Sequence, residues 1–183
     1  MYLDIETYSP RKEPSFEDKI ILIGLEIRGD VRLLKEWESS EKNILSEFYS
    51  LLKGKVGKET VTLIGWNLVR FDILFLTYRI WKHNIDSLAN IFEVFRKAYW
   101  RDLRLCLLPF NKYRFKGLSE DEIAKKFRIE HPIYSNKEIS YFYENRMFKK
   151  IEGHVVSELK FLSDLSWKMR NIKEAMRVFE SRE

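Results

Sequence analysis

The first residues that could do chemistry are two carboxylates near the start of the chain, Asp4 and Glu6, within the otherwise apolar segment at residues 2–7. Side chains alternate between the two faces of a strand, so residues two apart project from the same side. Two acids on one side of a buried strand repel each other unless a cation lies between them. The pair therefore indicates either a metal site or the solvent-facing side of a strand near a sheet edge.

A third acid, Asp72, opens a predicted helix shortly after a short apolar strand at residues 61–66. An acid in the first turn of a helix interacts favourably with the helix dipole, and this is a common structural role. Its functional meaning therefore depends on where the fold places it relative to Asp4 and Glu6.

The last group is His154 with Glu158 on the long C-terminal helix. Residues four apart share one face of a helix. The adjoining apolar stripe consists of Ile151, Val155, Leu159 and Leu162. The pair should lie at the edge of the buried face, where it either lines a polar site or forms an ordinary surface ion pair.

The segments that must position these groups begin with three strands. Alternating and apolar patterns predict strands at residues 2–7, 20–27 and 31–37, with a tight turn at Gly29 and Asp30. N-cap residues Ser39 and Ser40 predict a helix that ends near Gly54. The strand at 61–66 follows, and then helices over 71–81 and 87–97. A fifth strand is expected over 103–108.

The remainder of the chain is predicted to be helical. Capping boxes formed by Ser119 with Glu122 and by Ser135 with Glu138 predict helices that end near residues 127 and 144. A last helix is expected from residue 147 almost to the end.

This order of elements predicts one fold class. With right-handed crossovers, the fourth and fifth strands lie parallel to the first, which becomes central. The result is an α/β ribonuclease H-like fold, with a five-stranded mixed sheet of three antiparallel strands and two strands parallel to the first, flanked by helices. In this fold Asp72 would face Asp4 and Glu6. The length of 183 residues fits a single domain over residues 1–183.

Composition narrows the classes of protein. Hydrophobic residues make up 45% and charged residues 33% of the chain, which excludes a disordered protein. No apolar run reaches membrane-spanning length and no signal peptide is recognisable, so we expect a cytoplasmic protein without a membrane partner. Cys106 is the only cysteine, which excludes a cysteine zinc cluster. The net charge of +5 suits a polyanionic partner. The absence of glutamine, with abundant Lys, Glu, Arg and Ile, is typical of heat-adapted proteins.

The acidic motifs resemble those of the 3′-to-5′ exonucleases of the four-carboxylate (DEDD) superfamily, particularly the proofreading domains of family B DNA polymerases and their stand-alone relatives. Residues 3–7 match the first motif, Asp-x-Glu in a strand, and residues 67–72 match the more specific second motif, Asn-x-x-x-Phe-Asp. His154 and Glu158 correspond in place to the third motif, which is Tyr-x-x-x-Asp or, in a sister branch, His-x-x-x-x-Asp.

The resemblance implies a metal-dependent 3′-to-5′ exonuclease that acts on single-stranded nucleic acid, on DNA more than on RNA, in proofreading or DNA repair. Two Mg²⁺ or Mn²⁺ ions would be held by Asp4, Glu6, Asp72 and Glu158. His154 would orient or deprotonate the attacking water. Partners would be the single-stranded DNA or RNA itself and a polymerase or repair protein.

The third motif follows neither branch. Glu158 replaces an aspartate, which shifts the carboxylate by roughly 1.5 Å unless the helix or rotamer compensates. A misplacement of about 1 Å can cost on the order of 100-fold in rate. Two alternatives therefore stand beside the exonuclease: a catalytically weak or inactive nucleic-acid-binding or polymerase-associated subunit, and a structure-selective endonuclease.

Further residues are expected to meet the nucleic acid. Thr7 and Tyr8 follow the acidic strand, and Trp66 and Asn67 could line the groove. The segment 95–116 interleaves aromatic and basic residues, which suits single strands, although part of it must pack into the core. Its best candidates lie in a probable loop: Lys112, Tyr113, Arg114 and Lys116. The apolar spacing over residues 165–183 predicts packing onto the domain or, alternatively, a docking helix or weak dimer.

Overall fold

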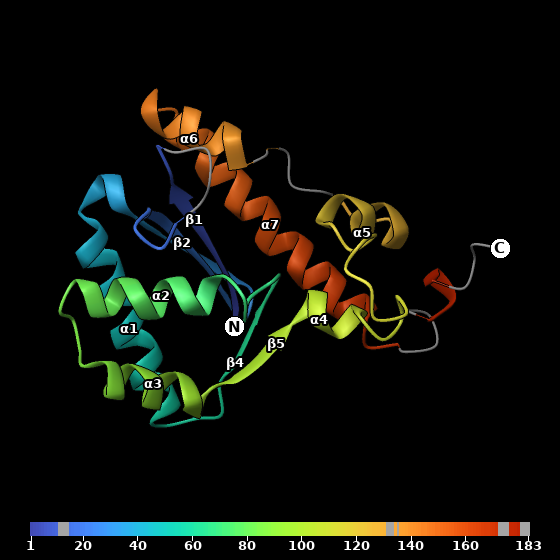
Figure 1. The fold of residues 1–183 in the computed structure, drawn as a ribbon, viewed down its shortest axis with the longest axis horizontal. Helices are drawn as coiled ribbons and strands as arrows, with labels where there is room; N and C mark the ends of the chain where they lie inside the picture. Colours follow the sequence, from blue (N-terminus) through green and yellow to red (C-terminus); the bar gives the residue numbers. More distant parts are fainter. Residues whose placement is uncertain (11–14, 131–133, 135, 172–175, 180–183) are drawn as a thin grey trace.

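A computed structural model gives the fold of the chain and describes residues 1–10, 15–130, 134, 136–171 and 176–179. Its centre is a five-stranded sheet in the order β3-β2-β1-β4-β5 (Figure 1). The strands are β1 (Tyr2–Tyr8), β2 (Lys19–Ile27), β3 (Asp30–Lys35), β4 (Thr62–Gly65) and β5 (Tyr99–Asp102). β2 pairs antiparallel with β1 and β3, whereas β1, β4 and β5 run parallel. The predicted fold class and the central place of the first strand are confirmed.

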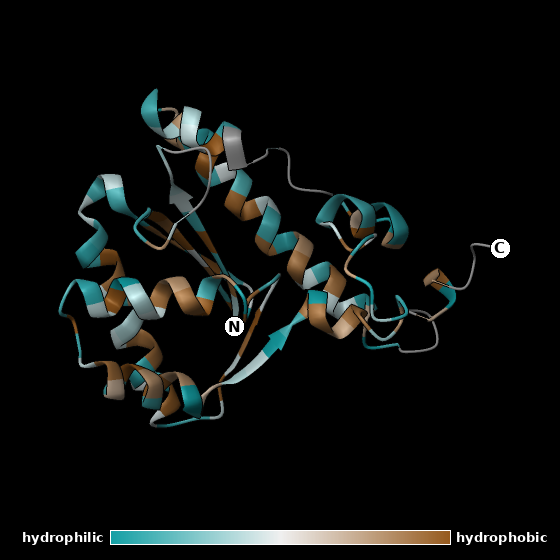
Figure 2. Cartoon of the chain, in the orientation of Figure 1, coloured by the Kyte–Doolittle hydropathy of each residue, from teal (hydrophilic) through white to brown (hydrophobic). Residues whose placement is uncertain are grey.

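Helices cover both faces of the sheet. On one side lie α1 (Glu41–Val56), α2 (Asp72–Lys82) and α3 (Leu88–Lys97), and on the other lie α4 (Leu103–Leu107), α5 (Glu120–Phe127) and α7 (Phe148–Lys168) (Figure 1). α6 (Asn136–Glu144) packs on α7 and β1, and a short 3-10 helix, Glu36–Glu38, follows β3. Along α1 and α7, hydrophobic and hydrophilic bands alternate, as expected for helices with one buried face (Figure 2).

The core is divided by the sheet into two clusters. Ile20, Ile23 and Leu25 of β2 belong to the cluster under α1 to α3. Ile21 and Leu22 of the same strand belong to the cluster under α7. A strand buried on both faces reads as a continuous apolar run, which is the pattern at residues 20–25.

The close approach of α7 to the sheet depends on Gly24. This residue lies opposite Asp4 in the β1–β2 pairing. A Cβ atom at Gly24 would lie 2.3 Å from Cγ1 of Val155 and 3.3 Å from Cδ1 of Leu159. The absence of a side chain therefore lets α7 pack directly over the strand pair that carries the acids.

The prediction of a fifth strand over residues 103–108 is wrong. The strand is β5, four residues earlier, and Leu103–Leu107 forms the short helix α4. The Asp102 carboxylate ends the strand and caps the helix, since it accepts the Leu105 N–H at 3.1 Å. Leu103 and Leu107, one helical turn apart, are both fully buried. A short apolar run does not distinguish strand from helix by its periodicity.

The hairpin turn lies one residue earlier than predicted. Arg28 and Gly29 have φ angles of 55° and 92°, and β3 already begins at Asp30. Two central residues with positive φ make the turn compatible with the twist of the strands. The Ser119–Glu122 capping box is confirmed. The Ser135–Glu138 capping box involves Ser135, which lies outside the described residues.

The last helix is shorter than predicted, because α7 ends at Lys168 and residues 176–179 form a separate helical turn. Leu165 and Met169 are buried against the domain. Phe179 packs its ring at 6.3 Å from those of Phe110 and Phe127. No helix among the described residues is long and apolar enough to cross a membrane.

Candidate active site

The acidic residues of four distant segments meet in one pocket of about 180 Å³. The pocket lies among β1, the turn that joins β4 to α2, the start of α5, and α7. Its lining consists of Asp4, Ile5, Glu6, Thr7, Trp66, Asn67, Phe71, Asp72, Glu120 and Glu158. The four carboxylates singled out in the sequence are therefore brought together.

Each acid is positioned by the local structure around it. Asp4 and Glu6 project from the same side of β1, as the strand period requires. Asp72 is the first residue of α2, and its side chain is buried against the acidic strand. The parallel pairing of β4 with β1 brings this turn beside the acidic strand.

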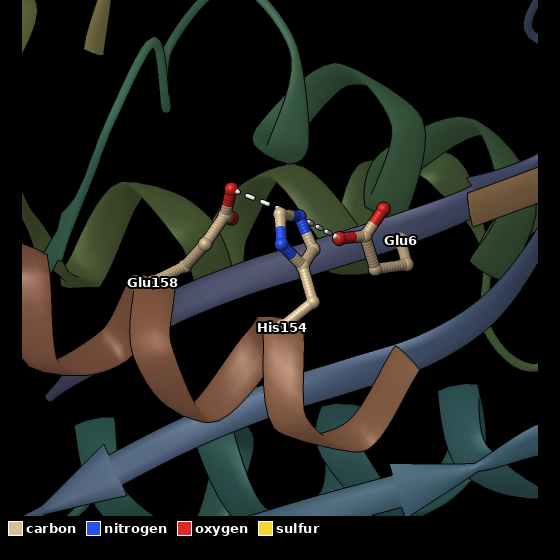
Figure 3. A group of neighbouring side chains, drawn as sticks. All are labelled: Glu6, His154 and Glu158. Carbon is tan, nitrogen blue, oxygen red and sulfur yellow. Dashed lines mark ion pairs between the residues drawn. The ribbon is translucent and has the colours of Figure 1, made fainter. Parts of the chain in front are cut away.

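α7 supplies the remaining pair. His154 and Glu158 project from one face of the helix toward Glu6 of β1 (Figure 3). His154 Nε2 lies 3.2 Å from Oε1 of Glu6 and 3.2 Å from Oε1 of Glu158. Within the described chain neither ring nitrogen makes a well-aligned hydrogen bond, so these contacts are ion pairs rather than directed hydrogen bonds. The histidine thus lies between two carboxylates and is itself 1% exposed.

The carboxylates perturb one another. Burial raises the pKa of Asp4 well above its ordinary value, and the charges of Glu158 and Glu6 raise it further. Burial likewise raises the pKa of Asp72 well above its ordinary value, although hydrogen bonds from its own backbone N–H and that of Ile5 oppose this. For Glu6 the effect of burial also prevails, although His154 lowers its pKa. Such a cluster is stable near neutral pH only with bound protons or cations.

The pKa of His154 is also raised, but for a different reason. Its burial favours the neutral imidazole, but pairing with Glu158 and Glu6 outweighs this and raises the pKa of His154 to about 10. With these neighbours alone, the side chain is an imidazolium at neutral pH. It therefore serves as a counter-charge that holds the two glutamates together across the gap between β1 and α7.

The residues present fit a divalent metal. Glu6 and Glu158 each offer a carboxylate oxygen, His154 offers a ring nitrogen in its neutral form, and these atoms lie within 4.8 Å of one another. Oδ2 of Asp4 is buried and has no hydrogen-bond partner among the described residues, which is costly unless a cation or proton satisfies it. Carboxylate oxygens are the ligands preferred by Mg²⁺ and Mn²⁺. Asp4, Glu6, Asp72 and Glu158 are the residues that would hold such ions.

The structure separates the predicted nucleic-acid contacts into two groups. Thr7, Trp66 and Asn67 line the pocket. Tyr8 does not line it, because its hydroxyl donates to Glu144 at 2.9 Å and its ring packs on that of Tyr143.

The other four expected contacts lie in an exposed loop outside the pocket lining. They are Lys112, Tyr113, Arg114 and Lys116. The Asn111 side chain holds this loop by donating to the backbone oxygens of Arg114 and Lys116. Tyr113 has 77% of its surface exposed, which leaves its ring available for stacking.

One acid of the pocket was not predicted from the sequence. Glu120, the first residue of α5, lies in the lining, and burial together with Glu158 raises its pKa well above the ordinary value. In the sequence it lies inside the Ser119–Glu122 capping box, where an acid is expected for helix-capping reasons alone. The sequence offers one signal for Glu120, namely an acid at this position in addition to Glu122, and this signal does not predict that the side chain faces the other pocket acids.

Comparison with known proteins supports the assignment of the fold. Residues 1–151 match the model of the RNase H superfamily. The matched segment includes Asp4, Glu6 and Asp72 and ends shortly before His154 and Glu158. A search of curated proteins finds no match.

Proposed function

Because the chain belongs to the RNase H superfamily, whose members are typically metal-dependent nucleases, we propose that it is a 3′-to-5′ exonuclease that releases nucleotides from single-stranded nucleic acid, with DNA as the preferred substrate. The observation that carries the proposal is the convergence of Asp4, Glu6, Asp72 and Glu158 on one pocket from three separate segments. The spacing of these acids in the sequence also resembles the DEDD exonuclease motifs.

The proposed mechanism assigns roles to the chain's own residues. The four acids hold the cations, and His154 fixes Glu6 and Glu158 relative to each other. Thr7, Trp66 and Asn67 contact the terminal nucleotide, because they line the same pocket. Bound Mg²⁺ or Mn²⁺ supplies the Lewis acid that activates water and stabilises the attacking and leaving oxygens of a phosphodiester.

The pocket size supports action on a strand end. A space of about 180 Å³ accommodates a terminal phosphodiester and the edge of a nucleotide, whereas a paired duplex would have to remain outside. We therefore expect the end of a single strand to enter, and the resemblance to the DEDD motifs makes this the 3′ end.

The test is degradation of a 5′-labelled single-stranded DNA, and of its RNA equivalent, with Mg²⁺ or Mn²⁺. We expect a ladder that shortens from the 3′ end, that Asp4→Ala abolishes and that Asp30→Ala leaves unchanged. Asp30 is a matched control because it is an exposed acid at the start of β3. Internal fragments in place of a ladder would identify an endonuclease instead.

A second candidate is a nucleic-acid-binding subunit that does not cleave. The observation in its favour is that the His154 imidazolium already supplies a positive charge between Glu6 and Glu158. A folded protein that retards the strand on a gel but shows no metal-dependent cleavage would establish this function and overturn the exonuclease.

A further inference from the structure

Beside the acidic pocket, Arg70, Arg104 and Phe115 form one cluster, which we call the arginine ledge. The guanidinium carbon of each arginine lies 5.2 Å from the centre of the Phe115 ring. The three residues come from separate segments: the turn before α2, helix α4, and the loop between α4 and α5. Only the tertiary fold brings them together.

The ledge is joined to the pocket by Asn67. Nη1 of Arg104 donates to Oδ1 of Asn67 at 3.4 Å, and the backbone oxygen of Asn67 accepts the Arg70 N–H at 3.1 Å. Asn67 itself lines the pocket. The positive ledge therefore begins at the rim of the acidic site.

Buried Asp102 fixes the relative position of the two arginine-bearing segments. One of its oxygens accepts the Leu105 N–H at 3.1 Å, and the other accepts the Val69 N–H, also at 3.1 Å. The turn that carries Arg70 and the helix that carries Arg104 are thus held by the same carboxylate. This makes the ledge a preorganised feature rather than two independent surface side chains.

The arginines retain unused binding capacity. Within the part of the chain that the structure describes, neither arginine pairs with a carboxylate, and Nε of Arg104 is buried without a hydrogen-bond partner, although its Nη1 donates to Asn67. Arg70 is exposed and Phe115 is 39% exposed. An unpaired guanidinium beside an opening suits a phosphate, which it can bind through two parallel N–H groups.

Positive charge at the rim compensates for the negative charge of the neighbouring pocket. A pocket lined by five carboxylates repels the polyanionic strand that it must admit, unless positive charge lies along the path of the strand. Two arginines at the rim supply that charge without entering the pocket. Phe115 contacts both guanidinium groups, of which that of Arg70 is exposed to solvent and that of Arg104 lies partly buried at the rim.

We propose that the arginine ledge binds the backbone of a single nucleic-acid strand whose 3′ end lies in the acidic pocket. Arg70 and Arg104 contact phosphates, and Phe115 is the positioning residue for both. This inference rests on the proposed function for the direction of the strand. Binding by the ledge is nevertheless measurable without cleavage.

The test is the affinity of the full chain for a 5′-fluorescein-labelled oligothymidylate, measured by fluorescence anisotropy in EDTA over a series of salt concentrations. Arg70→Met and Arg104→Met should each weaken binding by about tenfold. Each should also reduce the slope of log affinity against log salt by about 0.7, the value for one phosphate contact on a single strand. Lys42→Met is the charge-matched control, because Lys42 is exposed on α1 outside the pocket and the ledge.

Phe115 requires a conservative variant as its control. Phe115→Leu removes two cation–π contacts at an exposed site and should weaken binding by about 5- to 30-fold, and Phe115→Tyr should restore it. If Phe115 served only to stabilise the fold, Phe115→Leu would lower the melting temperature and Phe115→Tyr would not restore the affinity for the strand. Arg70 is exposed, so Arg70→Met tests the ledge even if variants of the other two residues fold poorly.

The outcomes separate this inference from the proposed function. If the protein binds the strand through the ledge but never cleaves it, the exonuclease fails and the ledge stands. If the protein cleaves while Arg70→Met binds like Lys42→Met with an unchanged salt slope, the ledge is refuted and the exonuclease stands. A wild-type protein that does not bind the strand in EDTA also refutes the ledge.

Discussion

Glu158→Asp is the most informative substitution at this site. It introduces the aspartate that the DEDD motif contains at this position. If Glu158 were a defect in the site, this substitution should increase the activity. We expect the opposite result. Oε1 of Glu158 already lies 3.2 Å from Nε2 of His154, and Glu158 also raises the pKa of Asp4, so the glutamate reaches both partners from the present position of α7.

The magnitude follows from this geometry. Removing one methylene withdraws the carboxylate by roughly 1.5 Å, to about 4.7 Å from the imidazolium, unless the backbone moves. At an effective dielectric constant of 20, the attraction falls from about 5 to about 3.5 kcal/mol. Relief of the repulsion by Glu6 offsets part of this loss, so the melting temperature should fall by at most about 6 °C. The displacement should lower the cleavage rate on the order of 100-fold.

The assay is single-turnover degradation of 5′-labelled DNA with saturating Mn²⁺, together with thermal unfolding of each variant. Glu152→Asp is the matched control, since it shortens another acid on α7 that pairs with Lys149 and Lys35 outside the pocket. Cleavage by Glu158→Asp at the wild-type rate or faster would refute the argument. It would show that α7 does not fix the position of this carboxylate.

Three further predictions concern the pocket, the opposite side of the sheet and the α7 contact. Mn²⁺ at 100 times its Kd should raise the melting temperature by about 5 to 11 °C. Because the raised pKa of Asp72 makes metal-free stability fall as pH rises above about 4, Asp72→Asn should reduce both this fall and the Mn²⁺ effect in calorimetry, while the other pocket acids keep part of each. Burial alone would raise the pKa of Glu41, but Arg79 donates to its carboxylate at 2.7 Å and the net pKa is lowered. The ionised Glu41 therefore stabilises the fold above about pH 4.5, and this stabilisation is lost as the pH falls through the lowered pKa. Glu41→Gln should lower the free energy of unfolding by about 3 to 5 kcal/mol in denaturant titrations at neutral pH and should weaken the dependence of stability on pH in acid. Gly24→Ala should destabilise the protein by about 1 to 3 kcal/mol and impair cleavage, because the new methyl group displaces α7. The control is Gly153→Ala, whose methyl group would meet nothing within 4 Å and which should stabilise the protein by about 0.5 to 1 kcal/mol. Equal free energies of unfolding for the two variants would contradict the close contact between Gly24 and α7.

Local periodicity accounts for what was predictable about the site. A strand period of two places Asp4 and Glu6 on one side, and a helix period near four places His154 and Glu158 on one face. These relations depend only on backbone geometry, which short-range sequence patterns report. The antiparallel start and the right-handed crossovers then limit the topology enough to bring Asp72 to the same edge.

The short apolar segment after β5 shows where local patterns fail. Leucines at 103 and 107 fit either a strand or one turn of helix. The choice is made by Asp102, whose carboxylate caps α4 and also binds the Val69 N–H from a distant turn. The second bond joins residues 33 positions apart, and no local pattern reports it.

The sequence by itself therefore determined the sheet order and the meeting of Asp4, Glu6 and Asp72, because both follow from periodicity and chain connectivity, whereas Glu158 was expected in the site through the resemblance to the DEDD motifs. Tertiary structure alone decided that Glu120 joins the pocket and that Arg70, Arg104 and Phe115 meet at its rim. It also decided that α7 lies close enough to β2 for His154 to reach Glu6, through the missing side chain at Gly24. These contacts join residues far apart in the chain, and their distances are set by how the helices pack on the sheet.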